Sequence, residues 1–296
     1  MVLRILACRA LMDAVLTPIW VLAPMFVLVH AAACDVRTRE VPDWHWAVIG
    51  VLGSVLCSLS CLDEAGVCAA VCPAVGAVLL TTYMLTDPPA LVRASMVIAA
   101  LVFYAVPLTV EPGDPFATAG LASAVAFFLF YGMYLVGLLQ GGADAKCLMT
   151  LALAFPVYPE TPWTPAIWDV TYPESLIFSP AVSTLVVGLV LSMACAIWVL
   201  SVNVRRRCFG RRMLTTYSMP VQEARDAHVW PAERLGERGT VQCCLCLDKG
   251  DVLDALEAAG VADVRVTPMI PFILPLVAAF AVTAILGSPL ALLIGA

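Results

Sequence analysis

Residues 116–139 read FATAGLASAVAFFLFYGMYLVGLL, a run without a single charged side chain. An α-helix rises about 1.5 Å per residue and the hydrocarbon core of a bilayer is about 30 Å thick, so a helix of this length crosses a membrane. This run therefore predicts a transmembrane helix.

The rest of the chain repeats this pattern. Of its 296 residues, 62% are hydrophobic and 13% are charged, which is more apolar surface than one soluble core can bury. We therefore expect an all-α, polytopic transmembrane helix bundle covered on its outside by membrane lipid. Apolar runs broken by proline, glycine and charge predict about eight spans, near residues 14–34, 46–62, 66–86, 90–110, 116–139, 145–158, 176–201 and 269–294.

Charged residues between the runs fall into two groups. The first group is basic: Arg37, Arg39, Arg93, Lys146, Arg205, Arg206, Arg207, Arg211 and Arg212. The second is mostly acidic: Asp63, Glu64, Glu111, Asp114, Glu160, Asp169 and Glu174, with Arg4 and Arg9. Because cytoplasmic loops carry an excess of Lys and Arg, we expect the basic group on the cytoplasmic side of the plasma membrane and both termini outside.

A polar segment interrupts the bundle near its end. Its composition predicts a soluble cytoplasmic insert at residues 202–267, between transmembrane helices in 1–201 and a last helix in 268–296. The insert is predicted to be a small α+β fold, with a helix at 251–259 and strands at 240–247 and 264–266 that pair. Three cysteines at positions 243, 244 and 246 are interpreted as part of a strand, because no second pair stands at zinc-finger spacing.

Two aspartates lie where predicted spans meet the cytoplasm. Asp35 closes the first span, and Asp144 follows the fifth within GGADAK, residues 141–146. Ionisable groups at a bilayer are costly and are functional candidates for that reason. Each also has a simpler interpretation: Asp35 is a solvated charge at a helix end, or Asp144 is the N-cap of the sixth helix.

A pair of such carboxyl groups can carry out aspartic-protease chemistry. Two carboxyls held close together cannot both ionise cheaply, so one keeps its proton and the other acts as a base. The base takes a proton from water, the water attacks the scissile carbonyl, and the protonated partner hydrogen-bonds to the carbonyl oxygen. No metal and no other cofactor is expected. Without substrate, we expect the two aspartates to be apart or loosely paired, and to titrate as a coupled pair.

Five further residues are predicted to support this pair. Arg37 and Lys146 would favour the ionised forms of the neighbouring aspartates, although both also serve as positive-inside anchors. Gly141 and Gly142 have no Cβ and allow a substrate strand or the other aspartate to approach closely. Pro271 interrupts the start of the last span and frees backbone groups for substrate, or it simply kinks the helix.

Both aspartate segments resemble motifs of the type IV prepilin peptidases and archaeal preflagellin peptidases, which are GxGD-type membrane aspartyl proteases. DVRTREVP at 35–42 is similar to the family's Asp-x-Arg segment with a following apolar-Pro step. GGADAK at 141–146 is similar to its Gly-x-small-Asp-x-Lys motif, with Ala143 in place of the glycine of the strict form. The resemblance covers residues 29–154 best, and residues 267–272 resemble archaeal members.

This resemblance implies that Asp35 and Asp144 are the catalytic dyad. It also implies that the substrates are precursor pilin or archaellin proteins, from which a short basic leader peptide is removed at the cytoplasmic face. Bacterial members often carry paired cysteines in a cytoplasmic loop and methylate their product, but the loop at 35–44 contains no cysteine. We therefore expect a peptidase without methyltransferase activity.

Two other functions remain open. A presenilin-like or signal-peptide-peptidase-like protease would cut inside a span and would have tyrosine where this chain has Cys34. A proton-coupled transporter would need ionisable residues at mid-membrane, and the predicted spans contain almost none apart from His30. His30 is interpreted as a packing residue, and His45, between two tryptophans, as part of an interfacial aromatic belt. The net charge of −6 does not indicate the basic surface that binding to a nucleic acid requires.

Overall fold

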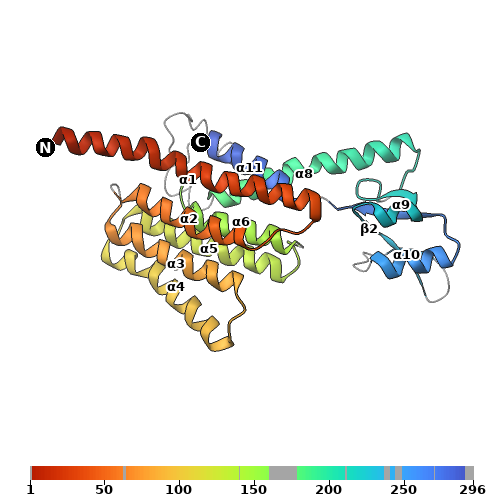
Figure 1. Ribbon diagram of the computed structural model, residues 1–296, viewed down its shortest axis with the longest axis horizontal. Coiled ribbons are helices and arrows are strands. Elements are labelled where there is room, and N and C mark those ends of the chain that lie inside the picture. The colour runs from red at the N-terminus through yellow and green to blue at the C-terminus, as the bar shows by residue number, and fades with distance from the viewer. Residues whose placement is uncertain are drawn as a thin grey trace. The chain divides into compact units, whose positions relative to one another are not determined.

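The computed structural model describes residues 2–62, 65–139, 141–159, 179–210, 212–236, 241–243, 249–269 and 271–290, with backbone alone at 2–14, 242 and 243. The described chain is mostly helical and forms two compact units (Figure 1). The first unit contains Met1–Leu189 and Pro271–Ala296, and the second contains Val190–Ile270. Both aspartates of interest lie in the first unit.

Helices dominate the first unit, because its apolar runs satisfy their backbone hydrogen bonds internally, as lipid requires. Six helices are long and apolar enough to cross a membrane, which makes the chain a multi-pass membrane protein by helix length and composition. They are α1 (Val2–Thr38, apolar from Val15), α2 (Trp44–Cys61), α3 (Val67–Leu85), α4 (Ala90–Val110), α5 (Pro115–Leu135) and α8 (Pro180–Arg205).

Two shorter helices complete the set that corresponds to the predicted runs. The helix α6 (Gly142–Ala154) lies at the sixth run, and α11 (Ile273–Leu286) lies at the last one. Neither is among the six long candidates, so a total of about eight spans stays a prediction. Some residues that were assigned to the two charge groups lie outside the described residues. They are Asp63, Glu64, Glu160, Asp169 and Glu174 of the acidic group and Arg211 of the basic group.

The helix α2 lies at the centre of the first unit. It packs against α1, α3 and α6, while α1 also packs along α11 and α5 packs against α6 (Figure 1). Glycines allow close contact: Gly50 faces Thr81 of α3, and Gly53 faces Ala154 of α6. Small residues at helix interfaces let backbones approach closely in membrane proteins. The helix α6, which carries Asp144, is thereby held on α2.

We predict that Gly53→Ala destabilises the protein. A Cβ at this position would lie 2.5 Å from the Cβ of Ala154, so α2 and α6 must move apart. Overpacking of this kind costs about 1–3 kcal/mol, which a lower midpoint of thermal unfolding in detergent would report. The matched control is Gly132→Ala in α5, where a new Cβ meets no atom within 4 Å. Equal unfolding midpoints for the two variants would contradict the close packing of α2 on α6.

Acidic side chains between α4 and α5 cap the start of α3. Glu111 accepts hydrogen bonds from the backbone N–H of Ala69 at 2.7 Å and of Cys68 at 3.3 Å. Asp114 accepts one from the N–H of Gly66 at 2.9 Å. Carboxylates at a helix N-terminus satisfy free N–H groups and interact favourably with the helix dipole. Two members of the acidic group therefore lie together at one end of these helices.

The second unit combines short helices with two small antiparallel sheets, so the polar segment has the predicted α+β character. One sheet has the order β1-β5-β2, and the other pairs β3 with β4. Its elements after α8 are β1 (Tyr217–Pro220), α9 (Val221–Asp226), β2 (Val229–Pro231), β3 (Glu233–Leu235), β4 (Val241–Cys243), α10 (Lys249–Ala258) and β5 (Asp263–Pro268). Its core is formed by Val221, Ala224, Val229, Leu253, Leu256, Val264 and Val266.

The predicted pairing of residues 240–247 with 264–266 is wrong. The strand β5 pairs with β1 and β2, whereas β4 pairs with β3. The true partners are short and end in Pro220 and Pro231, and proline is depleted in strands. The sequences of β1 and β2 therefore do not predict strands, whereas the more apolar segment at 240–247 does.

Candidate active site

Asp35 lies in the last turn of α1 and is half-buried. The helix is closed by Thr38, whose hydroxyl oxygen lies 2.9 Å from the carbonyl oxygen of Cys34 and 3.0 Å from that of Glu40. The next residue, Arg39, has a φ of 60°, in the left-handed region that non-glycine residues rarely adopt. This turn reverses the chain direction after α1 and keeps Arg39 in electrostatic contact with Asp35.

Asp144 lies in the first turn of α6, three residues after the N-cap residue Gly141. The interpretation of Asp144 as the N-cap is therefore wrong. Its carboxylate lies directly over Gly141, since a Cβ at Gly141 would be 2.1 Å from Oδ2 of Asp144. The side chain of Asp144 can therefore take this position only because Gly141 has no Cβ.

The structure brings the two aspartates into electrostatic contact, although they come from different helices. Burial, followed by the charge of Asp35, raises the pKa of Asp144 from 3.8 to about 7. Among the described residues no hydrogen bond joins the two carboxyl groups, and Oδ2 of Asp35 is buried without a hydrogen-bond partner. Two neighbouring carboxyls of this kind favour a state in which one is protonated and the other is ionised.

Positive groups surround Asp35 from two directions. Arg39 approaches it from the turn after α1, and the backbone N–H of Ile273, at the start of α11, points toward its carboxyl group. Arg37, which was predicted to provide this charge, is exposed and is not the interacting cation. Pro271 lies two residues before Ile273 and immediately precedes the turn into α11. The free N–H groups at a helix start are natural partners of a carboxylate.

Lys146 has a different role from the predicted one. Its Nζ lies 2.6 Å from Oδ1 of Asp43, and it is not among the groups that shift the pKa of Asp144. The prediction that Lys146 acts on Asp144 is therefore wrong. The ion pair instead joins the connection between α1 and α2 to the first turns of α6.

A pocket of about 180 Å³ adjoins the start of α6. It lies among α3, α4, α5 and α6 and combines aromatic with charged side chains. Gly142 and Lys146, which flank Asp144 in the sequence, form part of its wall. Other lining residues are Tyr83, Asp87, Arg93, Tyr131 and Tyr134. Arg93 and Lys146 were both assigned to the basic group, and this pocket brings them together.

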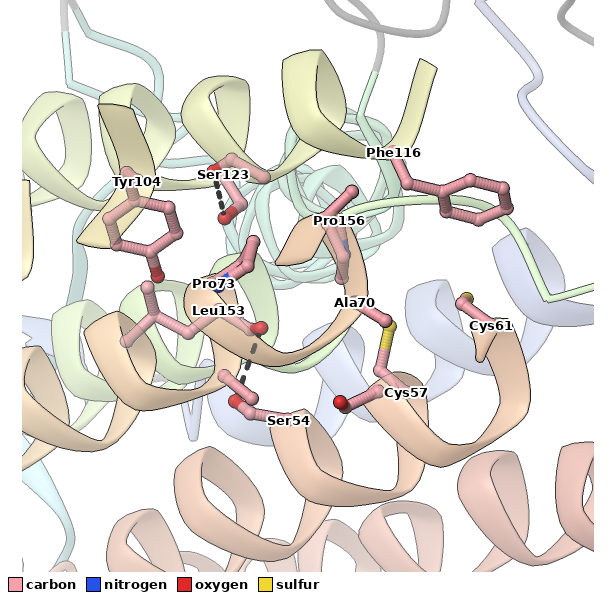
Figure 2. A pocket seen from close by; sticks show the side chains of 14 residues that line it. Ser54, Cys57, Cys61, Ala70, Pro73, Tyr104, Phe116, Ser123, Leu153 and Pro156 are labelled. Carbon is pink, nitrogen blue, oxygen red and sulfur yellow. Dashed lines mark hydrogen bonds between the residues drawn. The ribbon is translucent and has the colours of Figure 1, made fainter. Parts of the chain in front are cut away.

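A second space lies inside the bundle between α2, α3 and α5 (Figure 2). Its volume is about 30 Å³, and Ser54, Cys57, Tyr104 and Ser123 are among its lining residues. This volume has room for no more than a few water molecules, so the space cannot hold a peptide. The pocket beside α6 is the better candidate for contact with a substrate.

No model of a known protein family matches the chain, and no curated protein matches it. The functional conclusion therefore depends on the arrangement of its own residues.

Proposed function

We propose that this chain is a membrane aspartyl endopeptidase that removes short basic leader peptides from prepilin-like or preflagellin-like precursors. The observation that carries the proposal is the electrostatic contact between Asp35 at the end of α1 and Asp144 at the start of α6. Both carboxyls are partly withdrawn from water in a multi-pass membrane protein. Such a pair can supply the acid and the base of peptide hydrolysis.

The surroundings of the two carboxyls support different roles for them. Burial disfavours the charged form of Asp35, but Arg39 and the N–H of Ile273 lie beside it and oppose that effect, whereas Asp144 has a second carboxyl as its charged neighbour. Of the two, Asp35 is therefore better suited to be the ionised carboxylate that removes a proton from water. Asp144, with its raised pKa, suits the protonated acid that donates a hydrogen bond to the scissile carbonyl oxygen. The attacking water would lie between them. When the tetrahedral intermediate breaks down, the leaving amine takes up a proton from the pair.

The expected position of the site at the cytoplasmic membrane border supports this substrate class. A precursor with a basic leader before an apolar helix would place its helix in the bilayer and its scissile bond at the membrane border. Acidic side chains near the site can attract a basic leader, but Asp43 is already engaged by Lys146. The exposed carboxylate of Glu40 can attract the basic leader instead.

We predict that the cleavage rate falls as the pH rises through about 7. Asp144 must be protonated to act as the acid, and its pKa lies near that value, so its ionisation removes the acid. At strongly acidic pH both carboxyls are protonated and no base is present, so the complete profile is bell-shaped. The measurement is the initial rate of leader release by the detergent-solubilised protein across the pH range. A constant rate from pH 5 to pH 9 (about two units either side of this pKa) would contradict the assignment of Asp144.

The proposed function is tested by incubating the purified chain with a synthetic precursor and measuring the product mass. Release of the leader before the apolar helix is the expected result. A matched precursor in which every leader lysine and arginine is replaced by glutamine should be cleaved more slowly. A product cut inside the apolar helix would instead favour the presenilin-like alternative, and an intact precursor under all conditions would contradict peptidase activity on this substrate class.

A further inference from the structure

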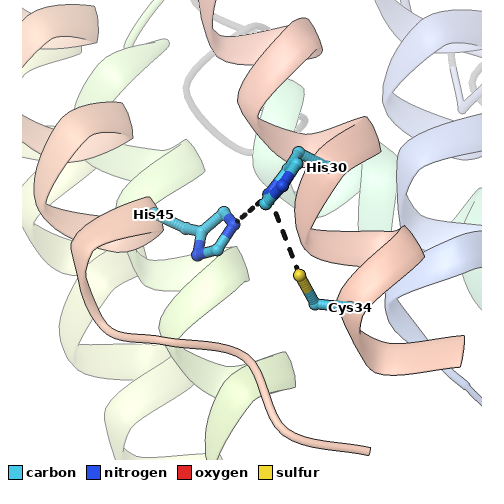
Figure 3. Close-up of side chains that lie close together, drawn as sticks. All are labelled: His30, Cys34 and His45. Atoms are coloured by element: carbon cyan, nitrogen blue, oxygen red, sulfur yellow. Dashed lines mark hydrogen bonds between the residues drawn. The ribbon is translucent and has the colours of Figure 1, made fainter. Parts of the chain in front are cut away.

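A second group of reactive side chains lies next to the aspartate pair. His30 and Cys34 are one turn apart on α1, and His45 lies at the start of α2 (Figure 3). Nδ1 of His30 lies 2.8 Å from Nε2 of His45 and 3.8 Å from Sγ of Cys34. One potential ligand atom from each residue lies within 4.8 Å of the other two. The interpretation of His45 as part of an interfacial aromatic belt is wrong, because this side chain is fully buried.

The hydrogen bonds of His45 define its tautomer. Its Nδ1 lies 2.8 Å from the carbonyl oxygen of Pro42, which can only accept, so Nδ1 carries the proton and donates. Neutral His45 therefore presents an unprotonated Nε2, which points at Nδ1 of His30 (Figure 3). A histidine that ligates a metal through one nitrogen usually donates its other N–H to a carbonyl or carboxylate in this way. His45 is thus already oriented as a metal ligand.

We propose that His30, Cys34 and His45 bind one Zn²⁺ ion. Two imidazole nitrogens and one thiolate are ligand types that zinc prefers, and three protein ligands leave a fourth tetrahedral position for water. Zinc–nitrogen and zinc–sulfur bonds of about 2.0–2.3 Å place ligand atoms about 3.3–3.6 Å apart in a tetrahedron. The observed separations of 2.8 and 3.8 Å from Nδ1 of His30 lie on either side of that range, and all three ligand atoms lie within 4.8 Å of one another. Side-chain rotations on the two helices would bring them to the distances that zinc requires.

Binding would connect α1 to α2 at the residue directly before Asp35. His45 also holds the carbonyl of Pro42, and the next residue, Asp43, pairs with Lys146 on α6. The ion would therefore stiffen the connection that joins the two aspartate-bearing segments. It takes no part in the proposed peptide hydrolysis, which needs only the two carboxyls and water. The zinc site does not depend on the proposed function and can be tested without any substrate.

Cobalt binding provides the test. The full-length protein in detergent, reduced and freed of metal, is titrated with Co²⁺ while its absorption spectrum is recorded. We expect the visible bands of tetrahedral Co²⁺ and a thiolate-to-cobalt charge-transfer band, both of which Zn²⁺ abolishes by displacement. His30→Ala and Cys34→Ala should each weaken binding at least about 10-fold, because the ligand set is then incomplete. Addition of Zn²⁺ should raise the thermal unfolding midpoint of the unmodified protein but not of these variants.

Competing thiols require controls. Cys68→Ser removes one member of the Cys68–Cys72 pair, whose sulfurs lie 3.5 Å apart, and the combined Cys243→Ser, Cys244→Ser and Cys246→Ser variant removes the insert cysteines. Both controls should keep the cobalt bands. The proposal is overturned if His30→Ala and Cys34→Ala bind Co²⁺ as tightly as the unmodified protein, or if either control removes the bands. His30 is exposed and Cys34 is half-buried, so both positions tolerate truncation better than buried His45.

Discussion

Asp35→Asn and Asp144→Asn are each expected to abolish leader cleavage while the protein remains folded in the membrane. Asparagine has nearly the same shape as aspartate but can neither take a proton from water nor donate one to a leaving group. Loss of general acid or base catalysis lowers rates about 100- to 10,000-fold. The measurement is the rate of leader release under single-turnover conditions, with unfolding midpoints recorded for both variants.

The control for these variants is Asp254→Asn. Asp254 forms an ion pair with Arg225 in the second unit, at 2.6 Å, and takes no part in the site. Asp254→Asn should leave cleavage unchanged. Near-normal cleavage by either Asp35→Asn or Asp144→Asn would rule out the aspartyl mechanism. If these variants lose both activity and folding, Asp35→Glu and Asp144→Glu, which keep the carboxyl group, separate the two effects.

Gly141→Ala is expected to cause the second-largest loss of cleavage. A Cβ on Gly141 would lie 2.1 Å from Oδ2 of Asp144, so the carboxylate must leave its present position. Displacing a catalytic group by about 1 Å costs on the order of 100-fold in rate. The loss should appear in the rate of the chemical step rather than in substrate affinity, because the pocket wall is unaffected.

The neighbouring glycine provides the comparison. A Cβ on Gly142 would lie 3.8 Å from its nearest neighbour, the hydroxyl of Tyr134, which is ordinary contact. Gly142→Ala should therefore lose far less activity than Gly141→Ala, although the two substitutions are chemically identical and adjacent. Equal losses for both would show that the position of Asp144 over Gly141 is unimportant.

The helices were predictable because membrane spans are evident from composition. The run at 90–110 coincides with α4, and most other runs agree with their helices within a few residues. The pairing of strands in the second unit was not predictable, because β1 and β2 are three or four residues long and contain proline. Their pairing depends on β5 burying Val264 and Val266, which local sequence does not encode.

The candidate site was predictable only in part. Two aspartates at predicted helix ends identified the carboxyl pair, since an ionisable group at a membrane border is costly and is kept mainly where it has a function. Their environment was not accessible in the same way. The charge of Arg39 acts on Asp35 from a left-handed turn, and the N–H of Ile273 reaches Asp35 where α11 packs along α1. The cluster of His30, Cys34 and His45 was missed because helical spacing links only the first two, and the third comes from a neighbouring helix.

The N–H of Ile273 beside Asp35 has a consequence for the timing of activity in the proposed enzyme. Asp35 and Asp144 are translated well before Ile273, so a nascent chain can contain both carboxyls while the positive end of α11 is still missing. Asp35 would then gain this hydrogen-bond donor only after α11 has been inserted beside α1. The site of the proposed enzyme would thereby be complete only when its last described helix is in place.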